Sequence, residues 1–478
     1  MKSKLQRVRD PVHNLIEFDR SQFEQALWSV IQSPPFQRLR RVRQLGFSEF
    51  VFPGATHTRF AHSLGVFHTA RALMRVVRQH ISENSGNQQF KEHQAQVALA
   101  AALVHDVGHG MFSHAFETVG KSLGLRMAQH ETVSEEIIRN TEIASVLTKE
   151  LGSGFANDVA DLIGRKEPGN LYDSVVSSQF DADRLDYMQR DRMMTGVQSS
   201  GIDLTWLLAN LQVASVSTGA DEDTTGSVET LVLGPKAIQT AESYVLSLFH
   251  LYPNVYLHKT TRGAEKVFGA LMQRLLSLGA SQEDRTGLPL THPIIKFAKN
   301  ANELTRALEL DDAVFWGALP MLVEARDKEI QNLALCLKDR LLPECIDIRR
   351  HVERELLANA NDNRVQHHAR ATLVCTRIET ALKRLPESGE GSSTPIFLDR
   401  YDRAPYKRYQ DSDTPLNRIL LRSSEAQLTD MADLSPVIAA AETFSISRAY
   451  VFRGDTHARE LVENTMRTEI AKGVQSNA

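Results

Sequence analysis

The chain has 478 residues, of which 42% are hydrophobic and 24% are charged, and its formal net charge is −4. This is the composition of a globular protein with a sizeable core, and the charge excludes a global attraction to nucleic acid or to an anionic membrane. Three widely spaced cysteines predict no disulfide framework. The N-terminus lacks an apolar signal segment, and the longest apolar run is too short to span a bilayer. We therefore expect a cytoplasmic protein.

Helical patterns dominate the first half of the chain. Apolar residues at three- and four-residue steps predict an amphipathic helix from near Thr58 to His80, and a nearly continuous apolar stretch predicts a central helix from Lys91, ended by Gly108 and Gly110. A third helix is expected from His130. A fourth is expected over 177–196, with Ser177 or Ser178 in the N-cap region and Gly196 as its stop.

The second half is more mixed. Two β-branched stretches flank a polar tip within 211–239 and predict a β-hairpin. Helices resume until about residue 276, and Pro253 is expected to interrupt them. A Gly-, Ser- and Pro-rich stretch over 386–396 is typical of a linker. A strand, turn, helix and strand pattern follows. We expect a mainly α fold with this small hairpin and a small C-terminal α/β lobe.

A set of histidines and aspartates stands out. His105 and Asp106 are adjacent at the predicted end of the central helix. His62 occupies a position on a helical face where an apolar residue would be expected, and Asp183 lies in another predicted helix. Two imidazoles and two carboxylates form a mixed N/O ligand set, which suits Fe, Mn, Zn, Ni or Mg better than thiolates would. A single histidine of this kind is usually structural, so only the combination predicts a metal site.

Several motifs surround these residues. They are DPVHNLIEF, FQRLRRVRQLGFSEFVFPGATHTRFAHSLGV, HDVGHGMFSHAFE, the pair His130-Glu131, DADRLDYMQRD and VYLHKTTRGAEKV. Together they resemble the HD-domain phosphohydrolase superfamily, in its dNTP triphosphohydrolase branch with vertebrate and bacterial members, over roughly residues 8–270. The resemblance implies an HD-domain helical core over 1–285, before a helical region over 286–390 and the α/β lobe over 391–478.

The resemblance also implies roles for individual residues. The metal ligands are His62, His105, Asp106 and Asp183. His130 is the catalytic histidine, with Glu131 beside it as orienter and His109 as the competing candidate. The residues that hold the triphosphate and the sugar are Gln44, Leu45, Arg59, His109, His114, Arg184, Tyr187 and Asp191.

The implied reaction is attack of water on the α-phosphorus of a dNTP, which releases a deoxynucleoside and inorganic triphosphate. A divalent metal ion (Mg, Mn, Fe or Zn) would polarise the phosphate, and a histidine would protonate the leaving 5′ oxygen.

An arginine-rich run, QRLRRVRQ, resembles an allosteric nucleotide site at a subunit interface. Gln37, Arg40 and Arg41 would contact the effector, and the chain would form a homo-oligomer, a dimer or a tetramer. The alternative interpretation is that the arginine-rich run is only a solvent-exposed face with no binding role. The resemblance departs at Gln32, where the vertebrate relative has an aspartate that reads guanine, so the effector need not be GTP.

Three other functions stay open at this point. The chain could be another HD nucleotidase or a phosphodiesterase, distinguished by its product. It could be a nucleic-acid-binding or nuclease-like protein that uses the arginine run, although the net charge argues against it. It could also be a non-catalytic nucleotide sensor, which the complete ligand set disfavours.

Overall fold

The computed structural model describes residues 4–84, 89–165, 168–199, 201–217, 227–357, 364–385, 395–404, 406, 418–423, 427–441 and 443–475. The first elements are β1 (Gln6–Asp10), β2 (Asn14–Phe18), α1 (Gln22–Gln32), α2 (Pro34–Gln37), α3 (Arg59–Asn84), α4 (Glu92–Val104), α5 (His114–Leu123), α6 (His130–Asn140), α7 (Glu142–Leu151), α8 (Phe155–Gly164), α9 (Ala182–Thr195) and α10 (Leu204–Asn210). Next come β3 (Leu211–Ser217), β4 (Ser227–Leu233), α11 (Ile238–Leu251), α12 (Lys259–Gly279), α13 (Pro293–Lys299), α14 (Leu304–Leu308), α15 (Asp312–Leu322) and α16 (Lys328–Lys338). The last are β5 (Glu344–Asp347), α17 (Ile348–Leu357), α18 (Arg364–Arg384), β6 (Phe397–Arg403), β7 (Leu420–Arg422), β8 (Leu428–Asp430), α19 (Met431–Leu434), α20 (Pro436–Ala439), β9 (Phe444–Val451) and α21 (Thr456–Gln475).

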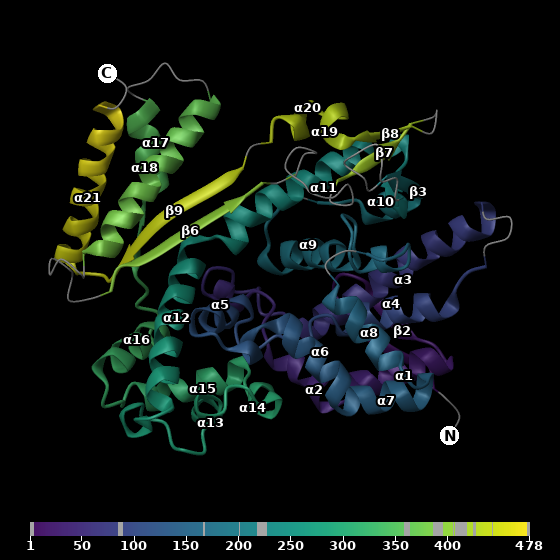
Figure 1. Cartoon of the computed structure of the whole chain (residues 1–478), viewed down its shortest axis with the longest axis horizontal. Coiled ribbons are helices and arrows are strands. Elements are labelled where there is room, and N and C mark those ends of the chain that lie inside the picture. Colours follow the sequence, from purple (N-terminus) through teal and green to yellow (C-terminus); the bar gives the residue numbers. More distant parts are fainter. Residues whose placement is uncertain are drawn as a thin grey trace.

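The fold is mainly helical with small sheets, as the sequence predicted (Figure 1). Helix α4 is central, because its apolar residues surround the helix and are buried on every side. It ends at Val104, before the glycines that we expected to end it. His105 and Asp106 consequently lie in the turn that follows the helix. Adjacent side chains in a turn can converge on one point, whereas on a helix they would point in different directions.

Helix α9 begins later than the sequence suggested. Its N-cap is Asp181, whose side chain accepts a hydrogen bond from the Arg184 amide, and not Ser177 or Ser178. The expected stop is confirmed, since Gly196 adopts a left-handed conformation with a φ of 75° after the last turn. The later start places Asp183 in the first turn of α9.

The predicted hairpin is confirmed as the antiparallel pair β3–β4, and its predicted tip, 218–226, lies outside the described residues. The interruption at Pro253 is also confirmed: a π-helical turn, η6 (Tyr252–Tyr256), separates α11 from α12. The hairpin continues into a four-stranded sheet of order β3-β4-β7-β8. Strands beyond residue 391 therefore pair with a hairpin that precedes them by almost 200 residues.

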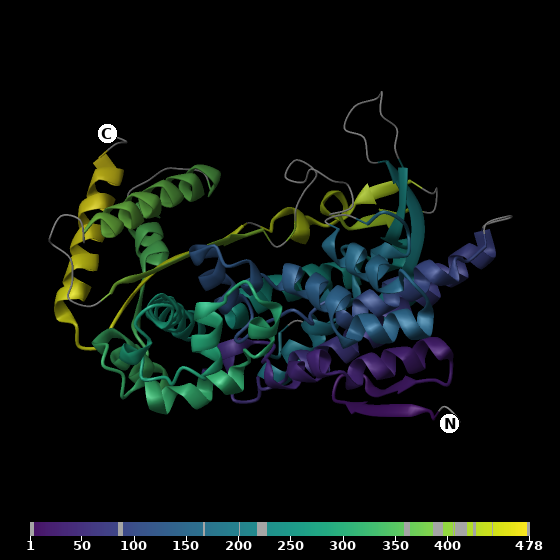
Figure 2. The same cartoon turned by 60° about the horizontal axis from the view of Figure 1, so that its bottom comes forward.

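A second sheet, of order β5-β9-β6, connects two parts of the molecule. Its long strands β6 and β9 form a ribbon that runs from the lobe of α17, α18 and α21 across the helical body (Figure 1). The β1–β2 hairpin lies on the far side of these helices (Figure 2). The ribbon therefore covers one face of the helical body.

Buried side chains of the described residues group into one large core, a smaller one in the lobe, and a small cluster of Val216, Val232 and Leu420 in the four-stranded sheet. Side chains of α13 to α16 lie in the large core, together with those of α3, α4 and α9. The smaller core joins α17, α18 and α21 to β9. The three-part division at residues 285 and 390 stays a prediction. Within the described residues, no helix is both long enough and apolar enough to cross a bilayer.

Candidate active site

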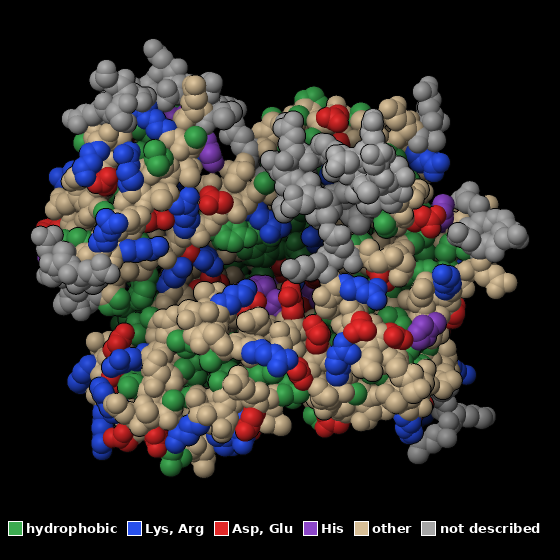
Figure 3. Space-filling model, in the orientation of Figure 1, with side chains coloured by type: hydrophobic (Ala, Val, Ile, Leu, Met, Phe, Trp, Pro, Cys, Tyr) green, Lys and Arg blue, Asp and Glu red, His purple; other side chains and the backbone are tan. Residues whose placement is uncertain are grey.

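A cavity of about 730 Å³ opens between the β6–β9 ribbon and the helices below it. Figure 3 shows it as a hollow in the surface with histidine and acidic side chains on its floor. The predicted site residues that line it are Gln44, Leu45, Arg59, His105, Asp106, His109, His114, His130, Glu131, Asp183, Tyr187 and Asp191. Residues from α3, the turn after α4, α5, α6 and α9 thus meet at one place.

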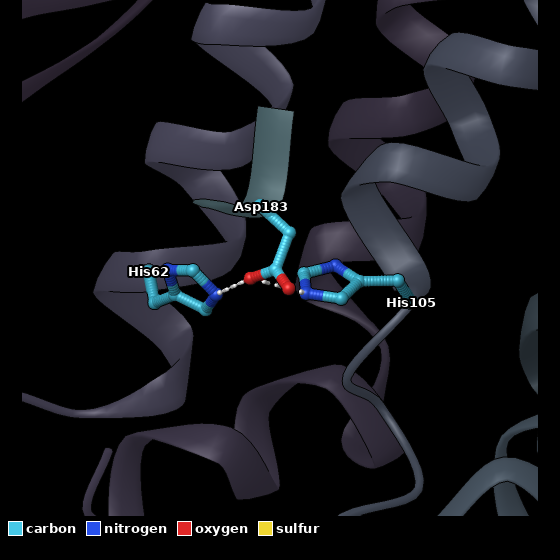
Figure 4. Close-up of side chains that lie close together, drawn as sticks. All are labelled: His62, His105 and Asp183. Atoms are coloured by element: carbon cyan, nitrogen blue, oxygen red, sulfur yellow. Dashed lines mark hydrogen bonds and ion pairs between the residues drawn. The ribbon is translucent and has the colours of Figure 1, made fainter. Parts of the chain in front are cut away.

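His62, His105 and Asp183 form a group whose ligand atoms lie within 4.8 Å of one another (Figure 4). His62 Nε2 is 2.9 Å from Asp183 Oδ1, and His105 Nε2 is 3.6 Å from the same oxygen. Asp106, the fourth expected ligand, is adjacent: its carboxylate oxygens lie 3.7 Å from His62 Nε2 and 3.4 Å from His105 Nε2. The structure therefore brings all four residues together.

The hydrogen bonds of the two histidines fit a metal ion. The Nδ1 atom of His62 donates to Asp186 at 2.8 Å, and that of His105 donates to the Ala102 carbonyl at 3.0 Å, so each Nε2 faces Asp183. This tautomer is the one that metal-bound histidines use. Among the described residues, His105 Nε2 is buried without a hydrogen-bond partner. The donor set of imidazole nitrogen and carboxylate oxygen suits a divalent ion.

Electrostatics point the same way. Burial alone would lower the pKa of His62, but its hydrogen bonds with Asp183 and Asp186 outweigh burial and raise the pKa to about 10. Burial opposes ionisation of Asp183, yet the two histidines hold its pKa below the usual range. A site that stabilises positive charge this strongly also favours a cation there.

Asp186 is a supporting residue that the sequence analysis missed. Its carboxylate is fully buried and binds His62 on one side, His13 Nε2 at 2.6 Å on another, and the guanidinium of Arg190 at 2.8 and 3.0 Å. Asp10 completes the network with contacts to Arg190 at 2.8 and 3.3 Å. Burial opposes ionisation of Asp186. The charge of Arg190, followed by the hydrogen bonds of the two histidines, nevertheless holds the pKa of Asp186 well below its usual range.

This network packs against α3 at Gly65. A Cβ atom there would lie 2.0 Å from Asp186 Oδ1 and 2.3 Å from Arg190 Nη2, so no larger residue fits. The spacing of Asp183, Asp186 and Arg190, three and four residues apart, was the available sequence signal for one helical face.

Asp106 also connects the metal group to the rest of the cavity. One carboxylate oxygen contacts the Arg59 guanidinium, whose Nε donates to Ser113 Oγ at 2.8 Å. The other oxygen is 3.2 Å from His109 Nε2. Burial opposes ionisation of Asp106, but Arg59 first and then the histidines hold its pKa well below the usual range.

A second cluster lies beside the first. The rings of His109 and His130 stack at 4.0 Å, and His114 meets both rings edge-on at 5.2 and 5.6 Å. The carboxylate of Glu117 accepts hydrogen bonds from His130 at 3.0 Å and from His114 at 3.1 Å. The contact of His109 with His130 depends on Gly108, because a Cβ there would lie 2.2 Å from the His130 carbonyl oxygen.

The carboxylate that contacts the His130 ring is that of Glu117, where the sequence analysis expected Glu131. Glu131 lines the cavity but is exposed, and within the described residues the carboxylate bonded to His130 is that of Glu117. Burial would raise the pKa of Glu117, but hydrogen bonds from His114 and His130 hold it well below the usual range. Burial, with Arg59 and His130, also lowers the pKa of His109 well below its ordinary value.

The other expected substrate residues have different surroundings. Asp191 is buried and accepts hydrogen bonds from His57 Nε2 and from the Tyr256 hydroxyl, both at 2.8 Å. Tyr187 packs edge-on against Tyr256 at 6.2 Å. The side-chain oxygen of Gln44 is buried and has no hydrogen-bond partner in the part of the chain that the structure describes. Arg184 does not line the cavity and instead pairs with Asp181 at 3.2 Å.

The arginine run is not a uniform solvated face. Arg38 is buried and donates to the carbonyls of Val107 and His109 at 2.9 and 2.7 Å, in the turn that follows His105 and Asp106. Arg41 pairs with Asp311 at 2.5 Å. Arg40 lies 3.6 Å above the Phe60 ring and donates to the Gln37 amide oxygen at 2.8 Å. These contacts leave the effector site a prediction.

Family models match two stretches of the chain: the HD domain over 59–188 and an HD-associated region over 223–307. The first contains all four expected ligands. The uncharacterized protein YwfO of Bacillus subtilis is 33% identical over 290 residues, which are 60% of this chain and 59% of that protein. The deoxynucleoside triphosphate triphosphohydrolase SAMHD1 of Bos taurus is 34% identical over 40% of this chain and 36% of its own length.

Solved structures cover more of the chain. A phosphohydrolase from Bacteroides thetaiotaomicron aligns with a TM-score of 0.68 and 23% identity over 94% of this chain and 100% of that one. A hypothetical protein from Aquifex aeolicus aligns with a TM-score of 0.65 and 22% identity over 98% of this chain and 100% of that one. These two show a shared fold. The HD match over 59–188 and the triphosphohydrolase relatives support an HD-domain phosphohydrolase with dNTPase-like relatives.

Proposed function

We propose that the chain is a metal-dependent hydrolase of phosphate esters that converts a dNTP to a deoxynucleoside and inorganic triphosphate. One observation carries the proposal: His105 and Asp183 of the ligand group line the same cavity as His130, whose ring is bonded to Glu117. Such a site offers a place for a metal-bound phosphate and, beside it, a group able to transfer a proton.

The residues divide the reaction between them. A divalent ion held by His62, His105, Asp106 and Asp183 would supply Lewis-acid polarisation of the α-phosphate. Arg59, beside Asp106, offers guanidinium donors to phosphate oxygens. His130 protonates the leaving 5′ oxygen, and the Glu117 carboxylate holds its ring from the other nitrogen.

The pKa of His109 supports this assignment over the competing one. Because burial and Arg59 lower that pKa well below its ordinary value, His109 is neutral near pH 7 and a poor proton donor. Its stacking with His130 and its contact with Asp106 suit a residue that positions a phosphate and its neighbour.

Gln44 and Leu45 are proposed to contact the deoxyribose, and Tyr187 and Asp191 to complete the sugar pocket. The unpartnered buried oxygen of Gln44 is available to accept a hydrogen bond from a sugar hydroxyl. Arg184 is the weakest of the expected substrate contacts, since Asp181 already pairs with it outside the cavity lining.

Product analysis tests the function. The protein would be incubated with each of the four dNTPs and with ATP, under Mg²⁺, Mn²⁺, Fe²⁺ and Zn²⁺, and the products separated by anion exchange. Deoxynucleoside and triphosphate are expected in equal amounts. Release of phosphate or pyrophosphate would instead support another HD nucleotidase, and turnover of a cyclic or dinucleotide alone would support a phosphodiesterase.

A nucleotide effector at Gln37, Arg40 and Arg41 and a homo-oligomer remain part of the proposal. Arg41 is 53% exposed on its side chain despite its pairing with Asp311, so it stays accessible to an anion. Replacing Arg40 and Arg41 with Glu should weaken nucleotide-dependent assembly, because binding and association are linked. Light scattering with and without dNTPs measures this, and unchanged assembly would leave the run a structural element.

A further inference from the structure

We propose that strand β6 supplies a nucleobase-binding surface, built from Tyr401 and Arg403 against Tyr252, at the edge of the catalytic cavity. The proposal rests on the proposed function and adds where the base of the nucleotide binds. These three residues line the same cavity as His105, Asp106 and Asp183, although β6 lies outside both matched family regions.

The pleat of β6 orients these side chains. Successive residues of a strand point to opposite faces, so Asp399, Tyr401 and Arg403 share one face while Arg400 and Asp402 share the other. Asp399 is buried, and Tyr401 and Arg403 are half-buried against the helical body. Arg400 and Asp402 are exposed. The register with β9 is continuous from Phe397 to Arg403, so the orientation is set along the whole strand.

A buried ion-pair network holds β6 in place. The fully buried Asp399 carboxylate binds Arg262 Nε at 3.0 Å and Nη2 at 2.5 Å, and Lys266 Nζ at 3.0 Å. Arg262 also binds Glu265 at 2.7 Å. Arg262, Lys266 and Glu265 belong to α12, which starts just after the π-helical turn that carries Tyr252. The network therefore positions Tyr401 over that turn.

The resulting surface is aromatic and cationic. The rings of Tyr401 and Tyr252 are nearly parallel, at 18° and a centroid distance of 6.4 Å, and Arg403 Cζ lies 4.4 Å from the Tyr252 ring centroid. Tyr252 meets Tyr256 edge-on at 5.1 Å, and Tyr256 donates to Asp191 in the proposed sugar pocket. A wall of tyrosines thus extends from the sugar pocket to β6.

This chemistry fits a nucleobase better than it fits phosphate. Bases have flat π faces that stack on tyrosine and on guanidinium groups, whereas a triphosphate needs several converging cations. The neighbouring cations Arg262 and Lys266 already pair with Asp399, and Arg262 also pairs with Glu265. Arg403 remains, and its guanidinium has donors for the acceptor atoms of a base edge.

The test separates base binding from phosphate binding. Calorimetric titrations of the metal-loaded full chain would use deoxynucleoside 5′-[α-thio]triphosphates and, separately, sodium tripolyphosphate. Tyr401→Ala should weaken binding of the deoxynucleotides by roughly tenfold, the size of one base–aromatic stacking interaction. Its tripolyphosphate affinity should stay within about twofold of the parent, because the variant keeps every phosphate contact. Arg403→Ala should weaken deoxynucleotide binding by about two- to fivefold.

Two matched variants act as controls. Tyr401→Phe keeps the ring and should bind like the parent, and Asp402→Asn changes the exposed face of the same strand and should have no effect. The proposed base-binding surface is wrong if Tyr401→Ala binds deoxynucleotides as tightly as the parent. It is also wrong if the variant's affinity for tripolyphosphate falls as much as its affinity for deoxynucleotides. Because these are binding measurements, they stand apart from the proposed function: products other than triphosphate would overturn the reaction and leave the surface intact.

Discussion

The two histidine clusters of the cavity are supported in opposite ways. His62 on α3 belongs to a cluster backed by the fully buried side chains of Asp186 and Arg190 on α9. The cluster of His114 and His130 is backed by Glu117, which is itself part-exposed, and His114 is 72% exposed on its side chain. A rigid, deep cluster suits a permanently bound ion, whereas an open one suits a group that exchanges protons with substrate and solvent.

The largest effect should come from removing a ligand of the deep cluster. Asp183→Ala deletes the carboxylate shared by His62 and His105, so bound metal and turnover should be lost together, with a fall of roughly 10³-fold or more. Elemental analysis beside an activity assay measures both. Full metal occupancy in Asp183→Ala would contradict the ligand assignment.

His130→Ala should separate the two clusters. It leaves the metal ligands untouched, so metal content should stay at the parent's value while turnover falls by roughly 10²–10⁴-fold. His109→Ala is the comparison variant, because both rings stack in the same place. A larger loss of turnover in His109→Ala than in His130→Ala would move the proton-donor role to His109.

The support behind His62 gives a matched pair of variants. Asp186→Asn should weaken metal affinity by roughly 10–100-fold, because it disturbs the hydrogen bond that orients the ligand. Asp10→Asn weakens the ion pair of the same buried Arg190 but removes no contact of His62. Both should lower the free energy of unfolding, by about 3–5 kcal/mol if the pairing of Arg190 is broken, measured by urea denaturation.

Only Asp186→Asn should change the metal affinity in a chelator competition. An equal loss of affinity in Asp10→Asn would mean that the network acts through general stability and not through ligand orientation.

The open cluster depends on a weaker support. Glu117→Gln replaces the charged partner of His130 and should lower turnover by roughly 10–100-fold, the worth of a charge-assisted hydrogen bond. Glu131→Gln is the natural control, since Glu131 is adjacent in sequence but exposed. Steady-state kinetics compare the two variants, and a larger defect in Glu131→Gln would restore the sequence-based assignment.

The structure brings together the four residues that the sequence analysis expected as ligands, because the motifs that carry them were recognisable in the sequence. His105 and Asp106 are adjacent, and Asp183 lies in a motif with its own charged pattern. Glu117 and Asp186 each stand three residues from a predicted site residue, so a search for shared helical faces had the signal to find them. The adjacent Glu131 drew attention only because chain neighbours are visible before spatial ones.

The β6 surface had no such signal. Tyr401 and Tyr252 are about 150 residues apart, and their meeting depends on the ion pairs of Asp399 with α12 and on the register of β6 with β9. The C-terminal strands likewise read as an α/β pattern, but their division between two sheets follows from long-range pairing. Patterns within a segment predict its type, whereas contacts between distant segments depend on packing that no local period records.

The smallest expected effect is a pH dependence that contrasts two buried aspartates. Asp312 accepts the amide hydrogens of Phe112 and Arg43, both at 2.8 Å, and so holds the backbone that leads to His114 and Gln44. Burial outweighs these bonds and, with Asp311 nearby, raises the pKa of Asp312 from 3.8 to about 7. Asp186, paired with Arg190, has its pKa shifted in the opposite direction.

The signs of the two contributions differ accordingly. Between pH 4 and 7 the folded state keeps a proton on Asp312 that the unfolded state has released, so this contribution to stability is full below about pH 4 and is lost as pH rises through 7. The contribution of Asp186 is present throughout that window and is lost only in stronger acid. Urea denaturation of the parent and of Asp312→Asn from pH 5 to 8 isolates the first, because Asn cannot titrate. Stability of the variant relative to the parent should rise with pH, and a difference that is constant across the range would mean that Asp312 stays ionised in the folded chain.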